Sequence, residues 1–278
     1  MLTKAENKFK ISDIFIGITL FTMFSPTFYR LITLGWKSAD YTHAYFILPI
    51  SLFLIWLKRK KLVKAEGGNV PGAVLFVLGI LAYIYSAINA FMFLEAASFV
   101  LVMWGIFRLR FTKESFACLL FPLAYLIFLI PPPGLVIDSL TFPLKKIASI
   151  GSHLVLSGFN LPVELYGVIL KVGGHELFIA DACSGFRSIV TLLALGAVYV
   201  YSQDTSNMKK WIIFISVVPI AIFANIFRIC LTGLIAYKWG AEKAEGFFHE
   251  FSGIVLFFIT VLFLMLLTRI LSKETARG

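Results

Sequence analysis

Long apolar runs separated by short polar segments extend along most of the chain. An α-helix needs about 20 apolar residues to cross the roughly 30 Å hydrocarbon core of a bilayer. The runs are Ile11–Leu34, His43–Leu57, Pro71–Phe91, Leu94–Phe107, Ser115–Ile130, Gly185–Tyr201, Trp211–Tyr237 and Phe251–Leu271. This pattern predicts an all-α polytopic membrane protein with about eight transmembrane helices. The fourth run is short for a full span, which favours a helix with little tilt, a locally thinned bilayer or a broken helix.

A less regular stretch lies between the fifth and sixth runs. Pro131, Pro132 and Pro133 end the fifth predicted helix, because proline lacks the backbone N–H that a helix interior needs. Leu135–Leu156 then mixes apolar residues with charged and polar ones, which predicts an amphipathic helix on the outer membrane surface. A re-entrant segment or a further pair of spans is the alternative interpretation.

The segment Glu164–Ile179 reads ELYGVILKVGGHELFI. Its β-branched and aromatic residues flank the pair Gly173–Gly174, and glycine allows the positive φ of a tight turn. We therefore expect a small external β-hairpin.

Composition places the whole chain in a bilayer. Hydrophobic residues make up 59% of the chain and charged residues 14%, and the mean hydropathy is +0.90. A soluble domain of this composition would have too few polar residues to cover its apolar ones. No polar stretch is long enough for a separate domain, so residues 1–278 are interpreted as a single membrane domain. The first run follows three lysines as in a signal peptide, but without a small-residue cleavage site we expect an uncleaved span.

The net charge of +10 reflects basic residues gathered in short loops, such as Lys58–Lys61. Basic loops remain on the cytoplasmic side, so the N-terminus is predicted inside and the charge favours membrane lipids over nucleic acid. This topology places the segment before Cys183 and the loop Lys238–Glu250 on the outer face of the cytoplasmic membrane.

Cys183 stands out among the three cysteines. It lies in DACSGFRS, among small and polar neighbours at the expected start of the sixth helix, whose dipole would favour the thiolate. Cys118 and Cys230 lie inside apolar runs and are interpreted as small buried hydrophobes. A disulfide between Cys183 and Cys230 is the alternative on an oxidising face.

Arg228 and His249 complete a candidate catalytic set with Cys183. An arginine within a span costs a few kcal/mol, so Arg228 in ANIFRICLTG needs a partner or a wet cavity, unless it snorkels to the headgroups. It lies 17 residues into its run, about 25 Å along the helix and near the outer boundary. His249 immediately precedes the last run. All three groups could therefore meet in one external pocket, with Asn225 bonding across helices nearby.

Several motifs occur in an order that resembles the exosortase and archaeosortase families: YTHAYFILPISLFLIW, FP followed by PPPG, DACSGFRS, ANIFRI and FFHEFSG. The resemblance covers most of the chain. It implies a membrane cysteine transpeptidase or protease that recognises a C-terminal PEP-CTERM-type sorting signal on exported proteins. Carried over onto this sequence, the family's cysteine is Cys183, its arginine is Arg228 and its third polar residue is His249, which is typical of the bacterial exosortases.

The implied chemistry is thiol acyl transfer. Cys183 would be the nucleophile, Arg228 would stabilise the thiolate and oxyanion, and His249 would act as general acid and base. The sequence has no metal-ligand spacing, P-loop or dinucleotide motif, so neither metal nor cofactor is expected.

Two rival functions fit the same composition. A transporter or scaffold of exopolysaccharide synthesis or export would use Arg228 to bind a lipid-linked anion, and should tolerate Cys183→Ser. A membrane protease would hydrolyse the same tail without transferring it to an acceptor.

Overall fold

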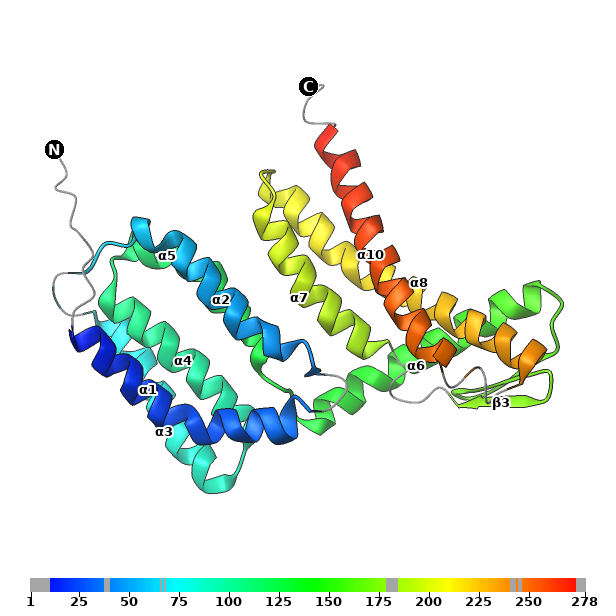
Figure 1. Ribbon diagram of the computed structural model, residues 1–278, viewed down its shortest axis with the longest axis horizontal. Coiled ribbons are helices and arrows are strands. Elements are labelled where there is room, and N and C mark those ends of the chain that lie inside the picture. The colour runs from blue at the N-terminus through cyan, green and yellow to red at the C-terminus, as the bar shows by residue number, and fades with distance from the viewer. Residues whose placement is uncertain are drawn as a thin grey trace. The chain divides into compact units, whose positions relative to one another are not determined.

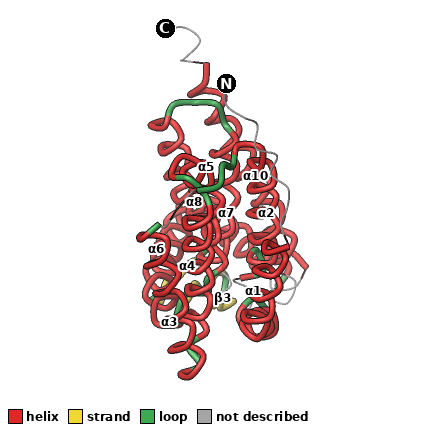
Figure 2. The backbone as a smooth tube through the Cα atoms, turned by 90° about the vertical axis from the view of Figure 1, so that its left-hand side faces the viewer, coloured by secondary structure: helices red, strands yellow, loops and turns green. Residues whose placement is uncertain are grey.

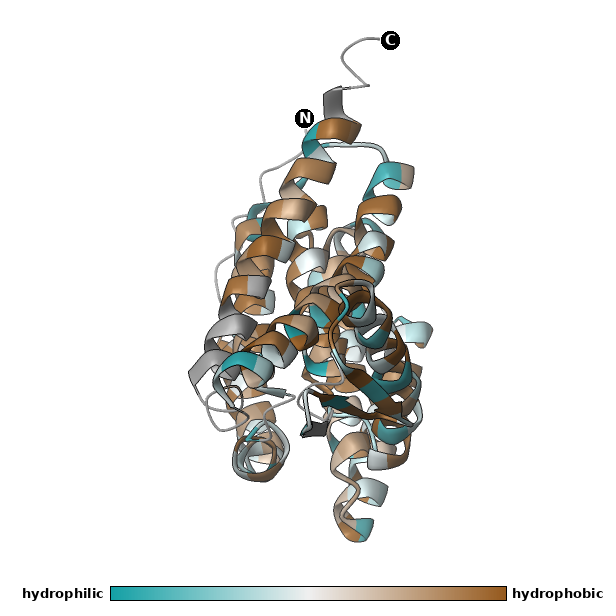
Figure 3. Cartoon of the chain, turned by 90° about the vertical axis from the view of Figure 1, so that its right-hand side faces the viewer, coloured by the Kyte–Doolittle hydropathy of each residue, from teal (hydrophilic) through white to brown (hydrophobic). Residues whose placement is uncertain are grey.

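The computed structural model describes residues 11–37, 41–65, 67, 69–178, 185–240, 244 and 247–273. Helices account for nearly all of the described backbone, and the strands form one small sheet (Figure 2). Apolar residues cover much of the helical surface in view (Figure 3). The chain is thus an all-α polytopic membrane protein, as predicted.

The described chain divides into two compact units, Met1–Pro133 and Gly134–Gly278. The boundary falls directly after Pro131–Pro133, where a break in the helical pattern was expected. Figure 1 shows the first unit in blue to green and the second from green to red. Each unit is described by itself.

Within the described residues, the first unit has five α-helices, and tighter or wider turns extend three of them. α1 (Ile11–Arg30) continues into a π-helical turn, and α5 ends in a 3₁₀ turn. The π-helical turn after α1 is η1 (Leu31–Gly35), and the 3₁₀ turn after α5 (Lys113–Tyr125) is η4 (Leu126–Leu129). The other helices are α2 (Ala44–Lys58, followed by a 3₁₀ turn at Arg59–Lys61), α3 (Val70–Asn89) and α4 (Met92–Arg110). Phe24, Phe99, Leu119 and Leu123 are buried together at its centre.

The hairpin of α3 and α4 is packed through glycines. A Cβ on Gly105 would lie 2.5 Å from the backbone nitrogen of Phe76, and one on Gly79 would lie 2.8 Å from the backbone nitrogen of Val102. Backbone atoms cannot move aside as a flexible side chain can. These glycines therefore set the close approach of the two helices.

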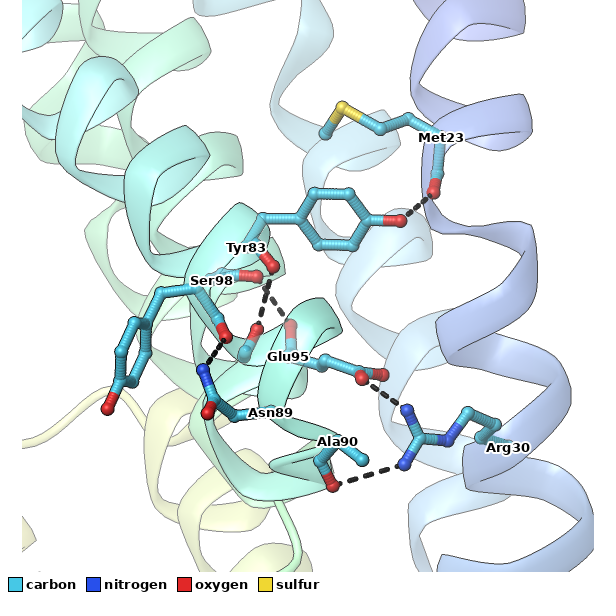
Figure 4. A network of polar contacts seen from close by, with 9 residues as sticks. Met23, Arg30, Tyr83, Asn89, Ala90, Glu95 and Ser98 are labelled. Carbon is cyan, nitrogen blue, oxygen red and sulfur yellow. Dashed lines mark hydrogen bonds and ion pairs between the residues drawn. The ribbon is translucent and has the colours of Figure 1, made fainter.

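A polar network fastens α1 to the α3–α4 turn (Figure 4). The Arg30 guanidinium forms an ion pair with the carboxylate of Glu95, and its other terminal nitrogen donates to the Ala90 carbonyl at 3.2 Å. The Glu95 side chain is 3% exposed and that of Arg30 is 31% exposed. Tyr83 adds a second link by donating to the Met23 carbonyl at 2.6 Å. The pair compensates a carboxylate that would otherwise be buried without a counter-charge.

The described part of the second unit includes the helices α6, α7, α8 and α10 and one sheet. α7 and α10 each pack against α8, and α6 packs against α8 and the sheet (Figure 1). The helices are α6 (Gly134–Gly158), α7 (Phe186–Ser202), α8 (Asn207–Trp239) and α10 (Phe247–Lys273), and the strands are β1 (Val163–Tyr166), β2 (Ile169–Val172) and β3 (His175–Phe178).

The predicted amphipathic helix Leu135–Leu156 is confirmed as a helix within α6. The predicted hairpin is confirmed at the Gly173–Gly174 turn, where β2 and β3 pair antiparallel with Lys171 opposite Glu176. A third strand, β1, pairs with β2 on its other edge, so the sheet order is β1-β2-β3. The additional turn uses Gly167, which has a φ of +63°.

Within the described residues, four helices are long and apolar enough to cross a membrane, or five if the helices on either side of Pro131–Pro133 count as one span. They are α1 with η1 (from Ile14), α3, α4 and α8. α2 and α7 have 15 and 17 residues and fall below the length of a full span. The expected number of eight spans therefore stays a prediction. α4 has 19 residues, so the expectation that the fourth span is short was wrong.

Candidate functional site

The candidate site is built around α8, a helix of 33 residues that carries Arg228. Arg228 is 8% exposed, although it lies in an apolar segment. Snorkelling into the headgroups would leave the guanidinium in water, so this burial favours the alternative that the chain provides polar partners within the protein.

Asn225 is one such partner. Its Oδ1 accepts a hydrogen bond from Nη2 of Arg228 at 2.9 Å, and the Asn225 side chain is itself buried, at 4% exposure. The two residues are three apart on α8 and therefore lie on the same face of the helix. This bond lies within one helix, and the predicted bond of Asn225 across helices stays a prediction.

The entry into α7 lies against this pair. Gly185, the residue before α7, has a φ of +81°, and its carbonyl accepts from the Ile189 N–H at 2.9 Å. A Cβ on Gly185 would lie 3.0 Å from Nδ2 and 3.1 Å from Cγ of Asn225. Glycine is therefore favoured here by its backbone conformation and by the neighbouring amide.

α6 supports α8 within the same stretch. A Cβ on Gly151 would lie 2.6 Å from Cδ1 of Ile226, and the Ser152 hydroxyl donates to the Ile226 carbonyl at 3.4 Å. The Cys230 thiol contacts the Ser152 carbonyl at 3.8 Å and is 6% exposed. The interpretation of Cys230 as a small buried residue is confirmed, whereas Cys118 is exposed on α5 and does not fit it.

The sheet packs against the last turns of α8. Leu170 and Val172 of β2 are buried in one cluster with Ile229 and Ala236 of α8. The turn at Gly173 lies against the ring of Tyr237. The predicted hairpin is thus attached to the same end of α8 that carries Arg228.

α10 runs antiparallel to α8. The Lys209 ammonium near the start of α8 donates to the Leu271 carbonyl near the end of α10. Arg228 is 19 residues after Lys209 and His249 is 22 residues before Leu271, distances of about 29 Å and 33 Å along the two helices. The backbone of His249, in the first turn of α10, therefore lies at a height comparable to Arg228.

The described structure thus brings Arg228, Asn225 and Gly185 together. Cys183 lies outside the described residues, and for His249 only the backbone is described. The expected meeting of the three side chains stays a prediction. Among the described residues, no group of three histidine, cysteine, aspartate or glutamate side chains could hold a metal ion.

Two features were missed by sequence reasoning. The Asn225–Arg228 hydrogen bond has a signal in retrospect, because an NxxR spacing on a helix brings amide and guanidinium together. The Arg30–Glu95 pair also has one, since each residue lies in or beside an apolar run that predicts a span. Neither signal identifies the partner, because that depends on which helices are neighbours.

Comparison with protein families decides the classification. The model of the transmembrane exosortase family matches residues 36–266. The chain belongs to this family. Searches of curated proteins and of solved structures gave no match.

Membership agrees with the fold and with the motifs. A transmembrane exosortase is an integral membrane protein, and the several apolar helices fit this. The family is consistent with a membrane cysteine protease or transpeptidase that acts on exported proteins. Both DACSGFRS and ANIFRI lie within the matched range.

Proposed function

We propose that this exosortase is a cysteine transpeptidase or peptidase that removes a C-terminal PEP-CTERM-type sorting signal from exported proteins. One observation carries the proposal. The buried Arg228 is linked through Asn225 to Gly185, the glycine of the DACSG motif. A buried cation beside a cysteine motif is suited to stabilise a thiolate and the oxyanion formed after its attack.

The first half-reaction is acylation of Cys183. The thiolate attacks the carbonyl carbon of the scissile peptide bond and forms a tetrahedral oxyanion. The C–N bond then breaks, His249 donates a proton to the leaving amine, and the C-terminal tail departs. The exported protein is left as a thioester on the sulfur.

The second half-reaction frees the enzyme. An amine or a water molecule attacks the thioester carbonyl, and His249 accepts the proton of this nucleophile. The C–S bond breaks and Cys183 leaves as thiolate. An amine gives transfer to an acceptor, and water gives hydrolysis.

Chain geometry supports the role of Arg228. Cys183 precedes Gly185 by two residues in the sequence, and two residues of extended chain span at most about 7 Å. Gly185 in turn packs on the amide that accepts the Arg228 hydrogen bond. In a poorly solvated site a guanidinium acts far more strongly on a nearby anion than it would in water.

The antiparallel packing of α8 and α10 supports the role of His249. Its backbone, in the first turn of α10, lies at a height comparable to Arg228. The unperturbed imidazole pKa of about 6.5 suits both proton transfers.

The proposal places the site on the outer face of the cytoplasmic membrane, because basic loops favour a cytoplasmic N-terminus. It treats residues 1–278 as one functional unit, since the family match includes residues of both compact units. No cofactor or metal is part of the proposed chemistry.

Co-expression with a tagged protein bearing a PEP-CTERM-like tail tests the proposal, with intact mass as readout. We expect the wild type to remove the tail and Cys183→Ala to leave it. Cys118→Ala is the matched control, because Cys118 is an exposed cysteine in the other unit and should retain processing.

The mass of the product distinguishes the two resolutions of the thioester, since an acceptor adds mass and water does not. Processing by Cys183→Ala, or no processing by the wild type across several tail sequences, would overturn the proposal. The alternative function, a transporter or scaffold of exopolysaccharide export, would then be favoured.

A further inference from the structure

We propose that Asn225 is a positioning residue of this site, which orients the Arg228 guanidinium and at the same time sets the place of the chain entering α7. The inference rests on the proposed function and deepens it. The Asn225 amide is the side chain that connects Arg228 with the cysteine motif.

The first observation is the bond between Asn225 and Arg228. A long arginine side chain has several rotatable bonds, so a cation in a cavity needs a fixed acceptor to hold one orientation. The Asn225 Oδ1 accepts from Nη2 at 2.9 Å, and both side chains are buried. A short side chain on the same helix face is a rigid acceptor, because only two torsions separate its oxygen from the backbone.

The second observation is the contact with Gly185. The space that a Cβ would fill there is bounded by Nδ2, Cγ and Cβ of Asn225, at 3.0, 3.1 and 3.3 Å. The amide is thus in contact with the backbone that leads from the cysteine motif into α7. One side chain therefore contacts both the Arg228 guanidinium and the glycine that ends the cysteine motif.

The chemistry of the amide matters as much as its shape. An asparagine oxygen accepts a hydrogen bond without placing a negative charge beside the guanidinium. Aspartate has nearly the same shape, but its carboxylate would compete with the Cys183 thiolate for the same cation. Asn225→Asp therefore keeps the acceptor and the shape and changes only the charge beside the guanidinium.

The test is the pH dependence of Cys183 alkylation by iodoacetamide, followed by mass spectrometry in the full-length Cys118→Ser protein. This readout requires no substrate. We expect Asn225→Asp to raise the apparent pKa of the Cys183 thiol and, at pH values below that pKa, to slow alkylation about tenfold, the effect of one pKa unit. Asn225→Ala should lower kcat for tail removal at least tenfold, with KM changed less than twofold.

Ser216→Ala serves as control on the same helix. The Ser216 hydroxyl donates to the Ile213 carbonyl within α8 at 2.7 Å, and its loss should change neither the alkylation profile nor the kinetics. Arg228→Gln is the reference that removes the charge. It should raise the thiol pKa at least as much as Asn225→Asp does.

The outcomes separate this inference from the proposed function. If Arg228→Gln raises the thiol pKa and a folded Asn225→Ala protein keeps the wild-type kcat, the positioning role is overturned and the proposed function stands. If Arg228→Gln leaves the profile unchanged, the proposed role of Arg228 fails and the role of Asn225 fails with it. Because Asn225→Asp keeps the side-chain shape, it gives a result even where Asn225→Ala does not fold.

A double-mutant cycle tests the contact with Gly185. Gly185→Ala should slow alkylation through its positive φ and through the collision with Asn225. In an Asn225→Ala background the collision is absent, so the same substitution should have a smaller effect. Equal effects in the two backgrounds would contradict the contact.

Discussion

The ring of Tyr237 lies directly over the backbone of Gly173: a Cβ at Gly173 would be 2.3 Å from Cδ2 of the ring. This contact joins the turn between β2 and β3 to the last turns of α8. The sheet is therefore held at the end of the helix that carries Arg228. Its turn has a tertiary role beyond reversing the chain.

Gly173→Ala should destabilise the second unit more than Gly174→Ala. Both glycines have positive φ, +57° and +87°, and an L-residue in this region costs about 1–2 kcal/mol. Nothing lies within 4 Å of a Cβ on Gly174, so only Gly173→Ala also displaces Tyr237. Thermal unfolding in detergent measures the difference, and equal losses of Tm would contradict the packing.

Gly105→Ala should open the α3–α4 hairpin. The new methyl group would meet the backbone of Phe76 at 2.5 Å, and we expect a loss of about 3 kcal/mol from overpacking. Gly17→Ala in α1 is the control, because no atom lies within 4 Å of its Cβ and alanine has the higher helix propensity. Gly17→Ala should leave Tm equal or slightly raised. A Gly105→Ala protein as stable as the wild type would refute the close approach.

Removing the Glu95 carboxylate should loosen α1 from the α3–α4 turn. Glu95→Ala breaks the ion pair with Arg30, a loss of about 2 kcal/mol for a hydrogen bond to a charged group. Glu95→Gln should lose less, since an amide oxygen still accepts from the guanidinium. The readout is Tm, with Thr19→Val as control, whose hydroxyl donates to the Phe15 carbonyl on an exposed face of α1. A smaller loss for Glu95→Ala than for Glu95→Gln would speak against the pair.

The pH profile of tail removal should report His249. Acylation requires an imidazolium to protonate the leaving amine, so kcat/KM should fall as pH rises through the histidine pKa, ordinarily about 6.5. The acidic limb should report ionisation of Cys183. His249→Gln should lower kcat/KM by about 10²–10⁴-fold and remove the alkaline limb. Retention of that limb in His249→Gln would assign it to another group.

The predictions from sequence succeeded where local pattern decides the structure. The apolar run Trp211–Tyr237 identified α8, and Gly173–Gly174 identified the turn between β2 and β3. The strand β1 was not recognised, although Gly167 marks its turn. A single hairpin already accounted for the alternation of residues, and pairing on the second edge of β2 depends on the tertiary fold.

The failures concern groups whose environment is set by distant partners. α4 was expected to begin at Leu94, but it begins at Met92 and continues to Arg110. Glu95 can lie in its first turn because Arg30 of α1 neutralises it, and sequence alone does not pair these residues. The burial of Arg228 was left open for the same reason. The hydrogen bond from Arg228 to Asn225 follows from helix geometry, but only once the helix is known to continue through both residues.

The length of α8 has a consequence for the host membrane. Its 33 residues span about 50 Å, which exceeds a hydrocarbon layer of about 30 Å. Arg228 is 21 residues from Asn207, about 32 Å, so it falls near the boundary of a layer that begins at the start of the helix. A thicker bilayer would surround this part of α8 and its neighbours with acyl chains, and a thinner one would surround it with headgroups and water. A mismatch between the length of α8 and the thickness of the bilayer thus changes the surroundings of Arg228, the charge that this exosortase keeps buried.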